Sequence, residues 1–217
     1  MKIAILGTGM VGDALGTKLV QLGHEVRMGS RTKGNVKAIE WVKKNGAKAT
    51  EGTFADAAKF GEIVLNCTSG VGSLEALKQA GSQNLKGKIL IDVANPLDFS
   101  KGMPPTLTIC NTDSLGEQIQ KAFPETKVVK TLNTTNCLVM VNPSMLTDGH
   151  DLFISGNDAA AKAEVTELIK KWFGWKRVID LGDITTSRGT EMLLAIWIRL
   201  MVALKTPNFN FKIVTES

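Results

Sequence analysis

A chain of 217 residues, 43% of them hydrophobic, is long enough to bury a substantial core as one or two domains. Its 26 basic and 21 acidic residues are interspersed and leave a formal charge of +5, which argues against nucleic-acid binding. Three scattered cysteines and two histidines predict neither a disulfide framework nor a metal site.

Targeting and membrane segments are not indicated either. The N-terminal stretch MKIAILGTGMVG is broken by glycines and lacks a small-residue cleavage site. The most apolar stretch, residues 192–204, carries Arg199 and is shorter than the ~20 residues that span a bilayer. We therefore expect a cytoplasmic protein with reduced thiols and no membrane partner.

The first elements in chain order predict a strand, a helix and a second strand. The apolar run KIAILG is typical of a strand buried on both faces. Leu15, Leu19 and Leu22 then recur at helical spacing until Gly23, and HEVRMG predicts the next strand. Between the first strand and the helix lies a G-x-G-x-x-G sequence, formed by Gly7, Thr8, Gly9, Met10, Val11 and Gly12.

Each glycine of this loop has its own physical role in dinucleotide binding. Gly7 permits the tight turn, Gly9 lets a pyrophosphate approach the backbone, and Gly12 lets the helix pack on the sheet. The N-terminus of the helix offers unpaired N–H groups and the positive end of its dipole to phosphates. Because the motif follows a strand and opens a helix, it predicts a dinucleotide site.

The end of the second predicted strand indicates which dinucleotide binds. Where an NAD-binding unit carries a carboxylate for the ribose 2′-OH, this chain has Gly29, Ser30, Arg31, Thr32 and Lys33. A guanidinium, a hydroxyl and a mobile ammonium suit a 2′-phosphate. We therefore expect NADP, with Ser30, Arg31 and Lys33 as contacts.

Further apolar runs predict the rest of a doubly wound, mostly parallel sheet. They span residues 62–70, 88–98 and 127–135, with helices between them. Ligands of such sheets lie beyond the carboxyl ends of the strands. The polar residues at these ends are candidate cofactor contacts, although turn chemistry would also select them; they are Thr68, Ser69, Asn95, Pro96, Asn133 and Thr134.

After Pro143 the chain predicts a small C-terminal α/β lobe, residues 144–217. It contains a strand, a helix, a second strand and a long apolar helix that we expect to be buried in this chain or in a subunit interface. The tail PNFNFKIV alternates with strand periodicity, and we expect it to dock on this chain or on a partner. At the start of the apolar helix, Arg188 either faces the cleft as a substrate contact or pairs with Glu191 at helical spacing.

The motifs together resemble the deazaflavin (coenzyme F420)-dependent NADP reductase family, which includes the reductase domain of the six-transmembrane epithelial antigen metalloreductases. The resemblance rests on GTGMVG, GSR, DVANPLD, KTLNT and LGDITTSRGTE, which span most of the chain. It implies an NADP-binding Rossmann domain, residues 1–143, the C-terminal lobe and a homodimer. By position, Thr8 to Val11 would line the pyrophosphate, Ser30 and Arg31 the 2′-phosphate, and Asn133 and Thr134 the nicotinamide.

Members of this family transfer hydride between NADPH and a flavin-like ring, so the resemblance implies no dedicated catalytic side chain. The acceptor is left open between deazaflavin, FMN or FAD, and a small carbonyl or imine compound. Two alternatives to a flavin-like acceptor follow. The protein could reduce a small keto or imino compound, or it could sense NADPH without catalysis.

Overall fold

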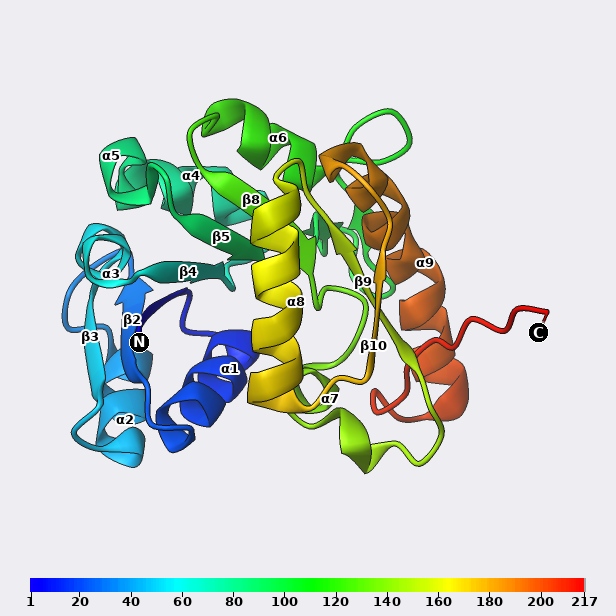
Figure 1. Ribbon diagram of the computed structural model, residues 1–217, viewed down its shortest axis with the longest axis horizontal. Helices are drawn as coiled ribbons and strands as arrows, with labels where there is room; N and C mark the ends of the chain where they lie inside the picture. Colours follow the sequence, from blue (N-terminus) through cyan, green and yellow to red (C-terminus); the bar gives the residue numbers. More distant parts are fainter. Residues whose placement is uncertain (217) are drawn as a thin grey trace.

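The structure is a computed structural model and describes residues 1–216. Strands and helices alternate along most of the chain (Figure 1). The elements are β1 (Lys2–Leu6), α1 (Met10–Gln21), β2 (Glu25–Ser30), α2 (Val36–Asn45), β3 (Ala49–Thr53), α3 (Phe54–Phe60), β4 (Ile63–Asn66), α4 (Gly70–Ala80), α5 (Ser82–Leu85), β5 (Ile89–Asp92), β6 (Leu97–Asp98), β7 (Thr106–Leu107), α6 (Leu115–Ala122), β8 (Lys127–Thr131), α7 (Cys137–Val141), η1 (Pro143–Met145), β9 (Asp151–Ser155), α8 (Ala159–Phe173), β10 (Arg177–Asp180), η2 (Ile184–Thr186) and α9 (Ser187–Leu204).

Eight of these strands form one sheet in the order β10-β9-β8-β5-β4-β1-β2-β3. All neighbouring strands are parallel except β8 and β9, which are antiparallel. This arrangement confirms the predicted doubly wound, mostly parallel α/β fold. Strands β4 and β5 are buried from end to end and β1 is buried after Lys2, as their apolar sequences predict, because helices cover both faces of the sheet.

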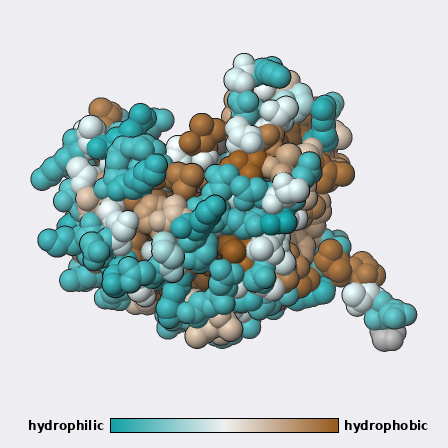
Figure 2. All heavy atoms as spheres, turned by 90° about the horizontal axis from the view of Figure 1, so that it is seen from above, coloured by the Kyte–Doolittle hydropathy of each residue, from teal (hydrophilic) through white to brown (hydrophobic). Residues whose placement is uncertain are grey.

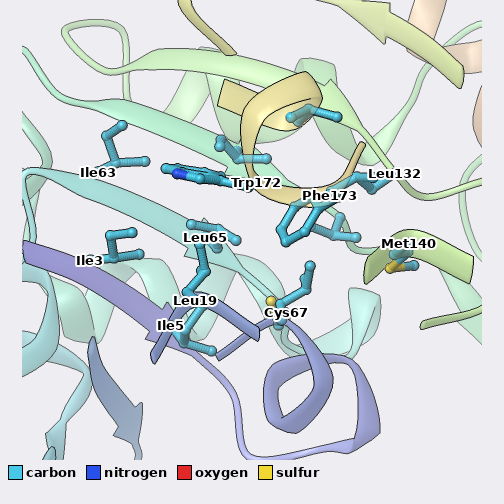
Figure 3. Close-up of a cluster of buried hydrophobic side chains, with 14 of the residues drawn as sticks. Ile3, Ile5, Leu19, Ile63, Leu65, Cys67, Leu132, Met140, Trp172 and Phe173 are labelled. Atoms are coloured by element: carbon cyan, nitrogen blue, oxygen red, sulfur yellow. The ribbon is translucent and has the colours of Figure 1, made fainter. Parts of the chain in front are cut away.

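Two apolar clusters form the core, one on each face of the sheet. Helices α1, α2, α7 and α8 cover one face, where Leu19, Leu65, Trp172 and Phe173 lie close together (Figure 3). Helices α3, α4, α5 and α6 cover the other face. Residues of the N-terminal half and of the C-terminal half thus pack together in both clusters.

The C-terminal residues extend this sheet instead of forming a sheet of their own. Strands β9 and β10 continue from the β8 edge, and α8 packs on the same face as α1. The expected lobe is therefore part of the main α/β layer arrangement, and a domain boundary at residue 143 stays a prediction.

The expected strand in the tail was wrong, whereas its expected docking on this chain is confirmed. Residues 206–216 form no helix or strand. The tail instead docks beside the start of β9, where the N–H of Asp151 donates to the carbonyl of Phe211 over 2.9 Å. The Phe209 ring stacks on Trp197 of α9, with ring centroids 5.2 Å apart. The alternation of apolar residues therefore reflects docking on α9 and β9, and the tail does not pair with β9 as a regular strand.

Helix α9 buries one face in this chain, including Leu194 and Ile198, and leaves its other face exposed. Its apolar side chains Met192, Ile196, Val202 and Leu204 are all exposed. The tail beyond it also carries exposed apolar residues where it leaves the body of the protein, at the right of Figure 2. Within residues 1–216, no helix has the length and apolarity needed to cross a bilayer.

Candidate functional site

The predicted site residues converge on one edge of the sheet because β1, β2, β4, β5 and β8 run in the same direction. From β1 the chain adds β2 and β3 on one side of the sheet, and then continues with β4 on the other side of β1. The strand order therefore changes direction between the neighbours β1 and β4. Ligands of open α/β sheets bind in the crevice at such a switch point. The crevice here lies beyond Gly7 on one side and Cys67 on the other.

The three loop glycines have different surroundings. Gly7 has a φ of 116°, and a Cβ on it would lie 2.6 Å from the carbonyl oxygen of Cys67. A Cβ on Gly12 would lie 2.3 Å from the carbonyl oxygen of Gly7. A Cβ on Gly9 would meet nothing within 4 Å. Gly7 and Gly12 are therefore required by the fold itself, whereas Gly9 leaves space open toward the crevice.

Two helices point their N-termini at this crevice without a capping side chain. Gly9 precedes α1 and Ser69 precedes α4, and neither makes a side-chain capping hydrogen bond. By contrast, side chains cap α2, α3, α6, α7 and α8. The first N–H groups of α1 and α4 thus stay available for an anionic ligand.

A cavity of about 750 Å³ runs from the glycine loop to the end of β2. Gly7, Thr8 and Gly9 line one end of it, and Ser30 and Arg31 line the other. Arg31 forms no ion pair with any residue of 1–216. An unpaired guanidinium at the end of a phosphate-binding crevice is available for a second anionic group.

The loop after β2 is held in place by hydrogen bonds. The Ser30 hydroxyl, which is buried, donates to the carbonyl of Thr32 over 2.6 Å. The N–H of Gly34 donates to a carboxylate oxygen of Glu51, on β3, over 3.0 Å. Lys33 is exposed and lies outside the cavity lining. Met10, expected at the pyrophosphate, is 82% exposed and lines a neighbouring hollow between α1 and α2.

A second, apolar cavity of about 200 Å³ adjoins the first along the loop after β4. The two cavities share Cys67, Thr68 and Ser69. Val11 lines this second cavity as well, and Asn95 lies in its wall. Its remaining apolar wall comprises Val93, Ala94, Leu97 and Phe99. None of these was predicted as a site residue, because the segment after β5 has no periodicity to indicate which side chains face inward.

Hydroxyl and amide side chains fix the strand ends around this cavity. The Thr68 hydroxyl donates to the Oδ1 of Asn66 over 2.6 Å and lies 2.8 Å from the Ser73 hydroxyl, so its proton is used within the fold. The Asn66 amide in turn donates to Asp92 over 2.8 Å. Burial raises the pKa of the Cys67 thiol well above its ordinary value, so this cavity residue stays protonated and is not a nucleophile.

Asn95 and Asn133 were expected to contact the cofactor, and the structure shows that their amides bind each other. Asn133 Nδ2 donates to Asn95 Oδ1 over 2.9 Å, and Asn95 Nδ2 donates to the Asn133 carbonyl over 2.8 Å. The pair joins the loops after β5 and β8. Pro96 follows Asn95 and lies outside both cavity linings.

Thr134 lies next to this pair and has an unusual environment. It is 1% exposed, and its hydroxyl has no hydrogen-bond partner among residues 1–216. A buried hydroxyl without a partner costs about 1–3 kcal/mol, and Thr134 lines neither of the two cavities.

Arg188 binds a carboxylate that the sequence did not indicate, and its expected contact with a substrate stays a prediction. Its Nε donates to Glu117 Oε2 over 2.8 Å, and its Nη2 binds the other carboxylate oxygen. The expected pair with Glu191 was wrong, because Glu191 lies against Lys130 with 2.8 Å between Oε1 and Nζ. Arg188 lines neither of the two cavities.

A buried charge cluster lies beneath the site and was not predicted. Lys130 on β8 binds Asp92 on β5 and Glu191 on α9, each over 2.8 Å, and all three side chains are almost fully buried. Burial alone would lower the pKa of Lys130, but the two carboxylates outweigh it and raise the pKa above its ordinary value. Glu191 also accepts from the N–H groups of Leu115 and Gly116 at the start of α6.

The fold and the crevice define a dinucleotide-binding protein of the Rossmann class. Residues 2–96 match the family described as NADP oxidoreductase, coenzyme F420-dependent. A solved structure from Arthrobacter sp. FB24, provisionally described as an F420-dependent NADP-reductase, is 56% identical, with a TM-score of 0.95 over 99% of this chain and 100% of that one. The chain belongs to this family and is an NADP-dependent oxidoreductase.

Other relatives cover less of their own length. The metalloreductase STEAP3 of Rattus norvegicus is 28% identical over 95% of this chain, which spans only 38% of that relative. A reductive aminase from Aspergillus terreus, solved with NADPH and ethyl levulinate, is 17% identical, with a TM-score of 0.65 over 94% of this chain and 62% of that one. At that identity the likeness shows the fold alone.

Proposed function

We propose that the protein transfers hydride between NADP(H) and a flat, flavin-like acceptor, for which deazaflavin (coenzyme F420), FMN and FAD are the candidates. The observation that carries this proposal is the apolar cavity that continues the cofactor crevice. Its wall includes Phe99, an aromatic side chain that is 57% exposed. An exposed aromatic ring beside an apolar slot suits stacking on a conjugated ring system.

The residues present fit the dinucleotide. The open space at Gly9, the uncapped starts of α1 and α4, and the unpaired Arg31 support a pyrophosphate at the glycine loop and a 2′-phosphate at the end of β2. The contacts that we propose are Gly7, Thr8, Gly9, Met10, Val11, Gly12, Ser30, Arg31, Lys33, Thr68, Ser69, Asn95, Pro96, Asn133 and Thr134.

When bound, the dinucleotide supplies the hydride chemistry, and the chain binds, orients and shields it. Val11, Leu97 and Phe99 would exclude water from the reacting faces. Thr68, whose proton is held by Asn66, would accept a hydrogen bond and fix the orientation of the nicotinamide half. Hydride transfer between the two bound molecules would require no acid, base or metal from the protein.

We also propose that the protein is a homodimer. The exposed apolar side chains of α9, with those at the root of the tail, supply a surface that a second copy would cover. Sedimentation equilibrium of the full chain tests this directly, because a monomer at micromolar concentration would contradict it.

The experiment that tests the function is stopped-flow oxidation of bound NADPH against deazaflavin, FMN, FAD and a set of small imino and keto acids. Rapid oxidation by a flavin-like acceptor supports the proposal. Oxidation by imino or keto acids alone would indicate a small-molecule reductase. Tight NADPH binding without oxidation by any acceptor would indicate a sensor.

A pair of variants sharpens this test. Phe99→Ala should slow oxidation by the flavin-like acceptor and leave the Kd for NADPH unchanged, because the ring faces the acceptor side. Met103→Ala is the matched control, since Met103 is 61% exposed on the same loop and does not line the cavity. Equal rates for both variants would contradict the assignment of the acceptor cavity.

A further inference from the structure

One wall of the larger cavity is a stripe along α4 that none of the phosphate or nicotinamide contacts explains. Gly72, Glu75, Ala76 and Gln79 line the cavity at helical spacing, so they share one face of α4. A Cβ on Gly72 would meet nothing within 4 Å, and Ala76 is 5% exposed. The middle of the stripe therefore carries only small side chains, which leave space free in the cavity.

Glu75 presents an electrostatic problem in this position. The cavity offers an unpaired guanidinium and helix N-termini, all suited to phosphates, and a carboxylate in its wall repels the same groups. Such a charge weakens binding unless the ligand also carries a hydrogen-bond donor that reaches it. The adenine ring of NADP has such a donor in its exocyclic amine, whereas its phosphates carry none.

Gln79 holds the Glu75 carboxylate in one orientation. Its Nε2 donates to Oε1 of Glu75 over 3.0 Å, one helical turn away. Oε2 of Glu75 has no partner among residues 1–216. Both side chains are exposed, so the pair lies at the rim of the cavity, where the edge of a flat base would emerge.

The geometry points to Glu75 as the specificity-determining residue for the base of the nucleotide. Its carboxylate accepts a hydrogen bond from the exocyclic amine of adenine, and the flat ring lies against Gly72 and Ala76. Gln79 is a positioning residue that acts through Glu75. This assignment rests on NADP binding in the larger cavity, and it adds selection of the base to the proposed function.

The sign of one substitution tests the assignment. Glu75→Gln removes a negative charge from a cavity for a polyanion, so a carboxylate that only repels phosphates predicts tighter NADPH binding. We expect the opposite, a Kd for NADPH about 3- to 10-fold higher, because the charge-assisted hydrogen bond is lost. Glu62→Gln is the matched control, since Glu62 is exposed immediately before β4 and outside the cavity.

The second arm replaces the base in the ligand. NADPH is compared with its hypoxanthine analogue, in which a carbonyl oxygen replaces the amine, by fluorescence titration of the full chain. The unaltered protein should bind NADPH about 5- to 20-fold tighter than the analogue, and Glu75→Gln should narrow this ratio to about 2-fold because an amide donates to the carbonyl. Gln79→Leu should lower this affinity ratio by a smaller amount, because Glu75 keeps its carboxylate but loses the hydrogen bond that orients it.

Three outcomes would overturn the assignment. Tighter NADPH binding by Glu75→Gln, or an unaltered protein that does not distinguish the two bases, would remove the role of Glu75 and leave NADPH binding intact. Failure of the unaltered protein to bind NADPH would instead overturn both this assignment and the proposed function. The measurement is of binding alone, so it does not depend on the acceptor.

Discussion

Arg188 and Glu117 form a bidentate ion pair that joins the first turns of α9 and α6, although 71 positions separate them in the chain. The hydrogen bond from Arg188 holds the pKa of the Glu117 carboxyl below its ordinary value of 4.5, against the opposing effect of partial burial. This pair links the C-terminal helix to the body of the fold at the edge that carries the site.

The pair should make stability depend on acid pH. Because the pKa of Glu117 is lower in the folded state, its contribution is fully present above pH 4.5 and is lost as the pH falls through the folded pKa. The difference in unfolding free energy between the unaltered protein and Glu117→Gln should therefore shrink below pH 4.5, as urea titrations at pH 7, 4.5 and 3.5 would show. Glu164→Gln, an exposed control on α8, should show no such trend.

Lys130 should be among the most sensitive positions of the core. Lys130→Met leaves Asp92 and Glu191 buried without a cation, which costs about 3–5 kcal/mol. Chemical denaturation measures this loss, and Asp92→Asn in the same chain should recover part of it. The exposed pair of Lys86 and Glu125 supplies the control, because both side chains are more than half exposed; Lys86→Met should change the unfolding free energy by less than about 1 kcal/mol.

The two glycines that flank Met10 and Val11 should separate folding from binding. Gly12→Ala places a Cβ against the carbonyl of Gly7 and should destabilise the fold by about 1–3 kcal/mol. Gly9→Ala meets open space, so it should leave the melting temperature nearly unchanged and weaken NADPH binding by about tenfold or more. Equal loss of stability in both variants would mean that Gly9 also serves the fold.

Arg31 should decide which dinucleotide binds. Loss of a charge-assisted hydrogen bond costs about 1.5–3 kcal/mol, so Arg31→Ala should weaken NADPH binding by roughly 10- to 100-fold and leave NADH binding nearly unchanged. Calorimetric titration with both nucleotides measures the two losses. Arg199→Ala, an exposed position on α9, is the control, and equal losses for NADPH and NADH would remove the proposed 2′-phosphate contact.

Several elements that position the site could not be predicted from local pattern. Strand β3 reads ATEGT, with neither an apolar run nor strict alternation, and it forms because β2 offers it a parallel partner. Similarly, the segment after β5 brings Leu97 and Phe99 to the apolar cavity only through its own fold. In both segments the apolar residues follow neither helical nor strand spacing.

The sequence by itself determined the elements and motifs that depend on neighbours in the chain. Apolar runs predicted the central strands, and the order of Gly7, Gly9 and Gly12 predicted the turn that opens α1. The absence of a carboxylate after β2, with Ser30 and Arg31 in its place, predicted NADP. These features are local, because turn geometry and helical or strand spacing act over a few residues.

Only the tertiary structure decided which distant groups pair. It placed Arg188 with Glu117 instead of Glu191, gave Glu191 to Lys130, and joined Asn95 to Asn133. It also fixed the place where the tail docks and left one face of α9 exposed. The sequence shows which side chains are charged or can form hydrogen bonds. Their partners depend on packing, because packing brings together side chains that many residues separate.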